Sequence, residues 1–329
     1  MSRALVLPLM LVPALAAAGP PELGLPVDCR IGETCWIIHT VDRDPGPGAR
    51  DSFCGPMSYD GHEGVDIGLA DLEAMARGVR VLAAAPGRVR GVRDRMPDIP
   101  VEQASGGATA VEGRECGNGV VLEHDGGWTT QYCHLRRGSV TVVAGQRVER
   151  GAVLGLVGNS GLASFPHVHL QVRDGDRTVD PFLPDMPEDA CSASPGRGLW
   201  QEQARAALVY TPVVLAALGL GDGPTDMGAV LAGTADDRPL TSRSPALVIH
   251  LMGYAFRAGD RITLELHDPS GERVFERHAV QERDQARTLL YGGRKRPESG
   301  WQPGPWRLVA TLDREGTVFR TERTVEVAQ

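Results

Sequence analysis

Apolar and polar residues alternate in short runs along much of the chain, which is the period of half-buried β-strands rather than of helices. In the first part, β-branched residues alternate on both sides of Pro86-Gly87, and this predicts a hairpin over residues 79–93. A second hairpin is predicted over residues 119–132, where Asp125-Gly126-Gly127 separates two strand-like runs. Further short strands, separated by glycines, are predicted at residues 140–148, 152–157 and 167–173.

The alternation returns in the last third of the chain, with turn sequences such as Asp268-Pro269-Ser270-Gly271 between the runs. Strands spaced about ten residues apart are typical of a β-sandwich of the immunoglobulin-like kind. The predicted strands are residues 246–251, 261–266, 273–275, 306–312 and 319–327.

The pattern therefore predicts a mainly β protein of two domains. A stretch rich in Pro, Gly, Ser and Ala at residues 187–198 is a linker candidate, and we place the boundary near residue 195. This gives a first domain at residues 19–194 and a C-terminal sandwich at residues 195–329. A helix is expected at residues 199–208, and the Pro- and Gly-rich residues 96–115 are expected to form a long surface loop.

The first residues have the pattern of a secretory signal. A charged start precedes an apolar run and the small residues Ala16-Ala17-Ala18, and the run is too short to span a bilayer comfortably. We therefore exclude residues 1–18 from the fold and expect a cleaved, periplasmic or secreted protein. Residues 206–220 are apolar but contain Pro212, so a buried element is expected there and no transmembrane segment in the mature chain.

Charge and cysteine content narrow the class of protein. The net charge of −8 provides no basic surface for nucleic acid, and no nucleic-acid partner is expected. An even number of cysteines, six, in an exported chain favours disulfides over thiols. Cys116 and Cys133 flank the second predicted hairpin, so we expect these two to be bridged.

Four histidines and one aspartate form three short clusters: His62 with Asp66, His134 alone, and His167 with His169. On a strand, residues two apart share a face, about 6.6 Å from each other. One imidazole of such a pair can hold a metal while the other reaches a water bound to that metal. Each cluster alone has an ordinary structural interpretation, but together they indicate a metal hydrolase. We expect His124, His250, His267 and His278 to be structural or exposed.

Glu63, which follows His62 directly, offers an alternative. On a helix this pair would match the beginning of the zincin motif H-E-x-x-H, with Glu63 as the base. The glycines that surround the pair argue against a helix, and in an extended segment Glu63 points away from the face of His62.

With their neighbours, these clusters resemble the lysostaphin/LytM-type zinc metallopeptidases, over about residues 60–184. The motifs come in that family's order, H-x-x-x-D, Y-x-H-L and H-x-H, at Gly61-His62-Glu63-Gly64-Val65-Asp66, Thr130-Gln131-Tyr132-Cys133-His134-Leu135 and Pro166-His167-Val168-His169. Gly158-Asn159-Ser160-Gly161 lies between the last two. The resemblance implies the family's antiparallel β fold, the duplicated hybrid motif.

The resemblance also implies the roles of the site residues and the activity. His62, Asp66 and His169 would bind Zn²⁺, while His134 and His167 would face the open coordination position and assist hydrolysis by a zinc-activated water. The substrate would be the cross-links or stem peptides of bacterial peptidoglycan. The alternative is a non-enzymatic or latent relative that binds and activates other cell-wall hydrolases. In either case the sandwich is expected to contact a cell-envelope partner.

Overall fold

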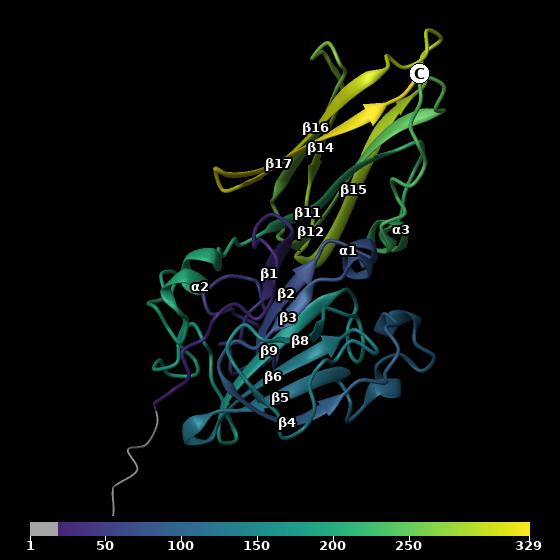
Figure 1. The fold of residues 1–329 in the computed structure, drawn as a ribbon. Helices are drawn as coiled ribbons and strands as arrows, with labels where there is room; N and C mark the ends of the chain where they lie inside the picture. Colours follow the sequence, from purple (N-terminus) through teal and green to yellow (C-terminus); the bar gives the residue numbers. More distant parts are fainter. Residues whose placement is uncertain (1–18) are drawn as a thin grey trace, which may run out of the picture.

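The computed structural model describes residues 19–329, and the predicted signal segment, residues 1–18, lies outside the described residues. Figure 1 shows one large sheet in the first half of the chain and two smaller sheets in the second half. Within residues 19–329, no helix has the length and apolar character needed to cross a membrane.

The first half contains an eight-stranded antiparallel sheet with the order β1-β2-β9-β6-β5-β4-β7, in which β10 also pairs with β9. Its strands are β1 (Cys35–His39), β2 (Val65–Leu69), β4 (Gly87–Arg93), β5 (Asn118–Glu123), β6 (Trp128–Leu135), β7 (Arg147–Val148), β9 (His167–Asp174) and β10 (Arg177–Thr178). A second sheet pairs β3 (Arg80–Leu82) with β8 (Val153–Leu156). Apolar side chains of both sheets form one core, including Ile67, Val81, Tyr132, Leu154 and Leu170. The predicted mainly β fold is confirmed.

One predicted hairpin is present and the other is wrong. Strands β5 and β6 pair as expected, across a short 3₁₀ turn at Asp125–Gly127. Strands β3 and β4, however, do not pair with each other, because β3 pairs with β8 while β4 pairs with β5 and β7. Between them Ala83, Ala84 and Ala85 are buried and carry the chain from one sheet to the other.

Other elements of the first half differ from the prediction in length or were not predicted. Of residues 140–148, only the last two form a strand, whereas Thr141 makes a single backbone hydrogen bond to Leu154. The expected loop at residues 96–115 is irregular apart from two 3₁₀ turns, Val101–Gln103 and Gly107–Val111. Helix α1 (Leu72–Arg77), which the sequence pattern did not predict, begins at the capping side chain of Asp71.

The second half is a sandwich of two antiparallel sheets, as predicted. One has the order β11-β12-β15 and the other β14-β13-β16-β17. The strands are β11 (Val214–Gly221), β12 (Ala246–Phe256), β13 (Arg261–His267), β14 (Arg273–Val280), β15 (Gln285–Lys295), β16 (Gly304–Arg314) and β17 (Thr317–Val327). Side chains from both sheets, among them Ile249, Leu264 and Leu308, fill a second core.

The segment that leads from the first domain to the sandwich packs on the first domain. Leu199, Trp200 and Leu208, with helix α2 (Glu202–Ala207), belong to the first core. The packing therefore moves our proposed boundary from residue 195 to a point after Leu208, and the division into domains remains a proposal.

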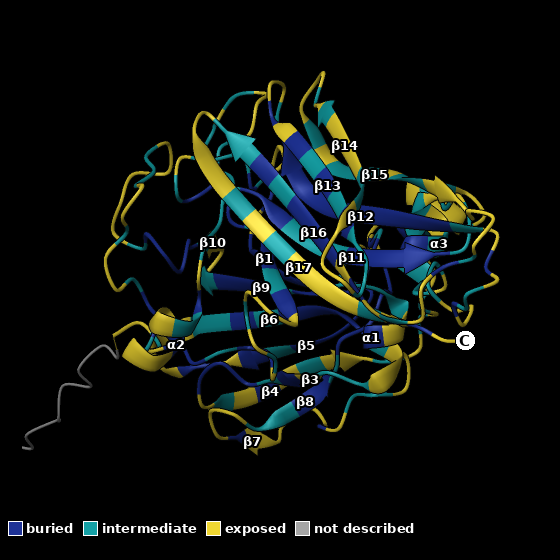
Figure 2. Ribbon diagram, turned by 90° about the horizontal axis from the view of Figure 1, so that it is seen from above, coloured by how far each residue is buried: buried dark blue, intermediate teal, exposed yellow. Residues whose placement is uncertain are grey.

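The two halves meet through apolar side chains. Ile38 and Phe165 of the first half form one buried cluster with Val214, Met252 and Tyr254 of the sandwich. Because of this contact, β12 is buried along almost its whole length, whereas β17 is largely exposed (Figure 2). Strand β12 has one face in the sandwich core and the other against the first half. Helix α3 (Met227–Ala232) adds a contact with α1.

Three disulfides link the six cysteines: Cys29–Cys35, Cys54–Cys191 and Cys116–Cys133. The bridge predicted between Cys116 and Cys133 is confirmed. It joins the segment just before β5 to the last part of β6, next to His134.

Candidate metal centre

The order of the strands brings the predicted site residues together. Strand β9 carries His167 and His169 and lies between β2, which carries Asp66, and β6, which ends near His134. Asp66 pairs directly with His169, and His169 pairs with Cys133 on its other side. Direct partners in an antiparallel sheet present their side chains on the same face. His62 lies in the turn that leads into β2.

Donor atoms of His62, Asp66 and His169 converge, all within 4.8 Å of one another. Nε2 of His62 lies 3.2 Å from Nδ1 of His169 and 3.2 Å from Oδ2 of Asp66. Nδ1 of His169 lies 2.8 Å from Oδ1 of Asp66. Among the described residues, this is the one group of His, Cys, Asp and Glu side chains that meets the criterion of a metal-binding cluster.

Backbone contacts and neighbouring charges leave His62 and Asp66 able to bind a cation. Nδ1 of His62 lies 2.8 Å from the carbonyl oxygen of Thr40, and by donating to it leaves Nε2 free as a ligand. Burial disfavours the charge on Asp66, but the neighbouring histidines outweigh burial and hold the pKa of Asp66 well below its usual range. Burial also opposes the charge on His62, yet the carboxylate of Asp66 raises the pKa of His62 overall.

Gly64 leaves the space that His169 occupies. A Cβ at this position would lie 2.6 Å from Cε1 and Nε2 of His169 and 2.6 Å from the carbonyl oxygen of Leu170. Because no real side chain tolerates such contacts, residue 64 has to be a glycine for the turn to pack on β9.

We therefore expect Gly64→Ala to displace His169 and to destabilise the fold by about 1–3 kcal/mol, the usual cost of overpacking. Urea unfolding and a zinc titration would measure the two effects. Gly91→Ala is the control, since a Cβ at Gly91 meets nothing within 4 Å. Unchanged stability and zinc affinity in Gly64→Ala would contradict the close packing.

His134 and His167 are oriented alike. Nδ1 of His134 lies 2.8 Å from the carbonyl oxygen of Ser160, and Nδ1 of His167 lies 2.8 Å from that of Phe165. Each ring thus donates from Nδ1 to the backbone and keeps Nε2 available. The two ring centroids are 4.5 Å apart, and Nε2 of His167 lies 3.9 Å from Oδ1 of Asp66. Burial lowers the pKa of both histidines, and for His134 repulsion from His167 and His169 lowers it further.

The backbone at His134 is strained in a way that the sequence does not reveal. Its φ is 61°, in the left-handed region that non-glycine residues seldom adopt. The backbone N–H of His134 donates to the carbonyl oxygen of Cys116, whose disulfide to Cys133 ties the same segment again. The loop that contains Ser160 completes the support. His134 is therefore held in a rare conformation by its neighbours on three sides.

A groove of about 280 Å³ lies beside the cluster. Its walls are Tyr59, Gly61, His62, Glu63, Glu115, Cys116, Gln131, Cys133, His134, Leu162, His169 and Gln171. The end of the loop at residues 96–115 thus forms part of one wall. The carboxylate of Glu63 lies 2.6 Å from Nε2 of Gln171 and also contacts Arg173, so Glu63 is directed along the groove and is paired there.

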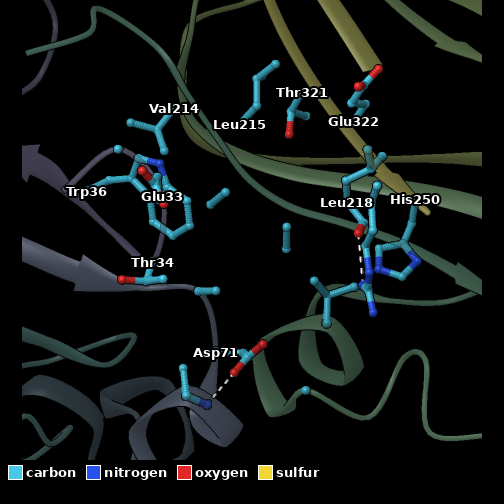
Figure 3. Close-up of a pocket in the computed structure, with 18 of the residues that line it drawn as sticks. Glu33, Thr34, Trp36, Asp71, Val214, Leu215, Leu218, His250, Thr321 and Glu322 are labelled. Carbon is cyan, nitrogen blue, oxygen red and sulfur yellow. Dashed lines mark hydrogen bonds between the residues drawn. The ribbon is translucent and has the colours of Figure 1, made fainter. Parts of the chain in front are cut away.

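A larger cleft, of about 1050 Å³, lies away from the cluster, between the two halves. Figure 3 shows Glu33, Thr34 and Trp36 of the first half across from Leu215 and Leu218 of β11. His250 also lines this cleft, beside Asp236. Two of the three convergent donors, His62 and His169, line the smaller groove, which is therefore the candidate site.

The other histidines include one that sequence reasoning missed. His124 bonds to the carbonyl oxygen of Pro86 and to Thr130, and His267 bonds to Glu265, so both are held by structural contacts. His39, by contrast, lies with Nδ1 2.9 Å from Oδ2 of Asp66. No motif marks His39, because its position beside Asp66 results from the pairing of β1 with β2.

Residues 60–181 match the model of the family described as Peptidase family M23. Over 71 residues the chain is 38% identical to the peptidoglycan DD-endopeptidase ShyB of Vibrio cholerae, covering 22% of this chain and 16% of that protein. Over 90 residues it is 33% identical to the DD-carboxypeptidase/endopeptidase Mpg of Neisseria meningitidis, covering 27% and 20%. The chain thus spans about a fifth or less of the length of these relatives.

A solved zinc-containing peptidase from Vibrio cholerae is 25% identical, with 45% of this chain and 41% of that chain covered and a TM-score of 0.29. A score this low adds nothing to the assignment, which rests on the family match and the motifs. Residues 60–181 therefore form a domain of peptidase family M23.

Proposed function

We propose that the protein is an exported zinc metalloendopeptidase that hydrolyses the peptides of bacterial peptidoglycan. The observation that carries the proposal is the convergence of donor atoms from His62, Asp66 and His169 beside His134 and His167, at the edge of an open groove. The membership of residues 60–181 in peptidase family M23 supports it.

The donor set fits zinc. Two imidazole nitrogens and one carboxylate oxygen are ligands that catalytic zinc takes, and three protein ligands leave a coordination position open. Donors about 2.0–2.1 Å from a tetrahedral ion lie about 3.3 Å from each other. Nε2 of His62 and Nδ1 of His169 lie 3.2 Å apart, and they lie 3.2 and 2.8 Å from the two oxygens of Asp66, close to that value. When bound, zinc would polarise the scissile carbonyl group and lower the pKa of a water molecule.

His134 and His167 would perform the proton chemistry. Burial lowers the pKa of each, so that each ring is neutral near pH 7 with Nε2 unprotonated. One Nε2 can then accept the proton of the attacking water. That ring then carries the proton of the water at Nε2 and can pass it to the nitrogen of the leaving group as the C–N bond breaks. The other ring can donate a hydrogen bond to the oxyanion that develops on the substrate when it has taken a proton from solvent at its own Nε2. The two rings are too similar in setting for the geometry to assign these roles.

The substrate proposal follows from the kind of protein that the chain resembles. ShyB is named a DD-endopeptidase and Mpg a DD-carboxypeptidase/endopeptidase. The direct cross-link between D-alanine and a diamino acid is a DD bond. We propose that cross-link as the target, with polyglycine bridges as the alternative. The sandwich would then serve as an accessory domain that contacts a partner in the cell envelope.

Removal of the metal tests the proposal. We expect a chelator to stop the release of peptides from isolated sacculi and added zinc to restore it, because without the metal the side chains of His62, Asp66 and His169 supply no Lewis acid to polarise the scissile carbonyl. Mass spectrometry of products from defined muropeptides would identify the bond. Release that persists without metal would contradict the zinc mechanism. Release only in the presence of another wall hydrolase would favour the non-enzymatic regulator instead.

A further inference from the structure

His39 contacts the carboxylate of Asp66 without belonging to the group of converging donors. Its Nδ1 lies 2.9 Å from Oδ2 of Asp66, and only 15% of its side chain is exposed. The cluster of atoms within 4.8 Å of one another contains His62, Asp66 and His169 but not His39. His39 therefore contacts the proposed metal ligand Asp66 without being one of the proposed ligands itself.

An irregularity in β1 gives His39 this position. Ile37 pairs with Ile67, but the next pair is His39 with Asp66, so that Ile38 is an extra residue in β1. With regular pairing, Ile38 would lie opposite Asp66 and His39 would point to the other face of the sheet. Bulges of this kind redirect side chains beside active sites. His39 thus extends the row that Asp66 and His169 form across the sheet.

The hydrogen-bonding capacity of Asp66 explains what His39 can do there. Oδ1 of Asp66 faces Nδ1 of His169 at 2.8 Å, while Oδ2 is close to both His39 and His62. His62 has to present Nε2 without a proton in order to bind a metal, because its Nδ1 already donates to Thr40. His39 is then the imidazole that can donate a hydrogen bond to Oδ2.

We propose that His39 is a positioning residue, whose Nδ1–H donates to Oδ2 of Asp66 and fixes the carboxylate so that it can bind the metal. This rests on the zinc site of the proposed function. The ring of Tyr59 packs edge-on against that of His39, with centroids 5.1 Å apart, and limits its rotation. Hydrogen-bonding partners of metal ligands typically contribute about 10- to 100-fold to metal affinity.

The test is the zinc affinity of the full chain, measured by competition with a chromophoric chelator. We expect His39→Ala to bind zinc about 10- to 100-fold more weakly than the wild type. His39→Asn should recover most of the affinity, because its side-chain amide can donate from nearly the position of Nδ1. His124→Ala, a buried histidine outside the cluster, is the matched control and should keep the affinity of the wild type.

The outcomes separate this proposal from the function on which it rests. Equal affinity in His39→Ala and the wild type overturns the positioning role alone, whereas a wild type that binds no zinc overturns the proposed function. A loss that His39→Asn does not recover overturns the hydrogen-bond role in favour of simple packing. X-ray absorption of the zinc-loaded wild type and His39→Asn should give the same number of imidazole ligands, and a difference would make His39 a direct ligand. If His39→Ala does not fold, His39→Phe keeps a ring against Tyr59 and removes the donor.

Discussion

His169→Ala should abolish both zinc binding and peptide release. His169 contributes the central donor, since its Nδ1 contacts both Asp66 and His62, and the strand that carries it lies between the strands of Asp66 and His134. Loss of a Lewis acid worth several kcal/mol corresponds to a fall of more than about 1000-fold in the rate. Elemental analysis of the purified variant and the release of peptides from sacculi would measure the two losses.

The control for this variant is His278→Ala. His278 is an exposed histidine on β14 of the sandwich, and its removal should leave metal content and activity unchanged. A circular dichroism melt of both metal-free variants would show whether the fold persists. Equal, metal-independent release by His169→Ala and the wild type would contradict the proposed function, because no other group of converging donors exists among residues 19–329.

The elements that sequence reasoning found are those whose pattern is local. Alternation or a short apolar run marks β5, β6, β9 and most strands of the sandwich, and the Asp125–Gly127 turn marks a hairpin. The pairing of β3 with β8 could not be inferred, because it depends on buried alanines that lead the chain to another sheet. Strand β15 was missed because Gly292 and Gly293 interrupt its pattern. A Cβ at Gly293 would lie 2.0 Å from the carbonyl oxygen of Leu247, so the close approach of β12 requires the glycine.

The same distinction applies to the site. His62 and Asp66 share one motif and His167 and His169 another, so spacing alone could indicate that each pair acts together. What spacing could not show is how the pairs are joined, which depends on β2 and β6 both pairing with β9. The contact of His39 with Asp66 was harder still to predict, because it depends on a bulge in an edge strand. Residues placed by nonlocal pairing leave no periodic signal in the sequence.

The contact between the two halves connects the sandwich to the site. Phe165 packs on Tyr254 of the sandwich, and its ring also lies 4.8 Å from that of His167 between centroids. The carbonyl oxygen of Phe165 accepts the hydrogen bond from Nδ1 of His167. The sandwich therefore supports the segment that orients one of the two proposed catalytic histidines.

The second large effect is expected in His134→Ala and His167→Ala, which should lose activity while they keep zinc. Neither Nε2 belongs to the group of converging donors, so the metal content should stay at the level of the wild type. General acid–base groups typically contribute 10²- to 10⁴-fold, and we expect kcat for muropeptide cleavage to fall by about that much in each variant. Steady-state kinetics on a defined muropeptide, together with elemental analysis, would measure both quantities.

The double variant decides whether the two histidines act in one step. Residues that act as a unit give losses that are far from additive. Because the two rings lie 4.5 Å apart and face the same cluster, we expect His134→Ala with His167→Ala to lose little more activity than the worse single variant. Losses that multiply would indicate independent steps. A single variant that loses its zinc would instead make that histidine a ligand, and would contradict the division into three ligands and two assisting histidines.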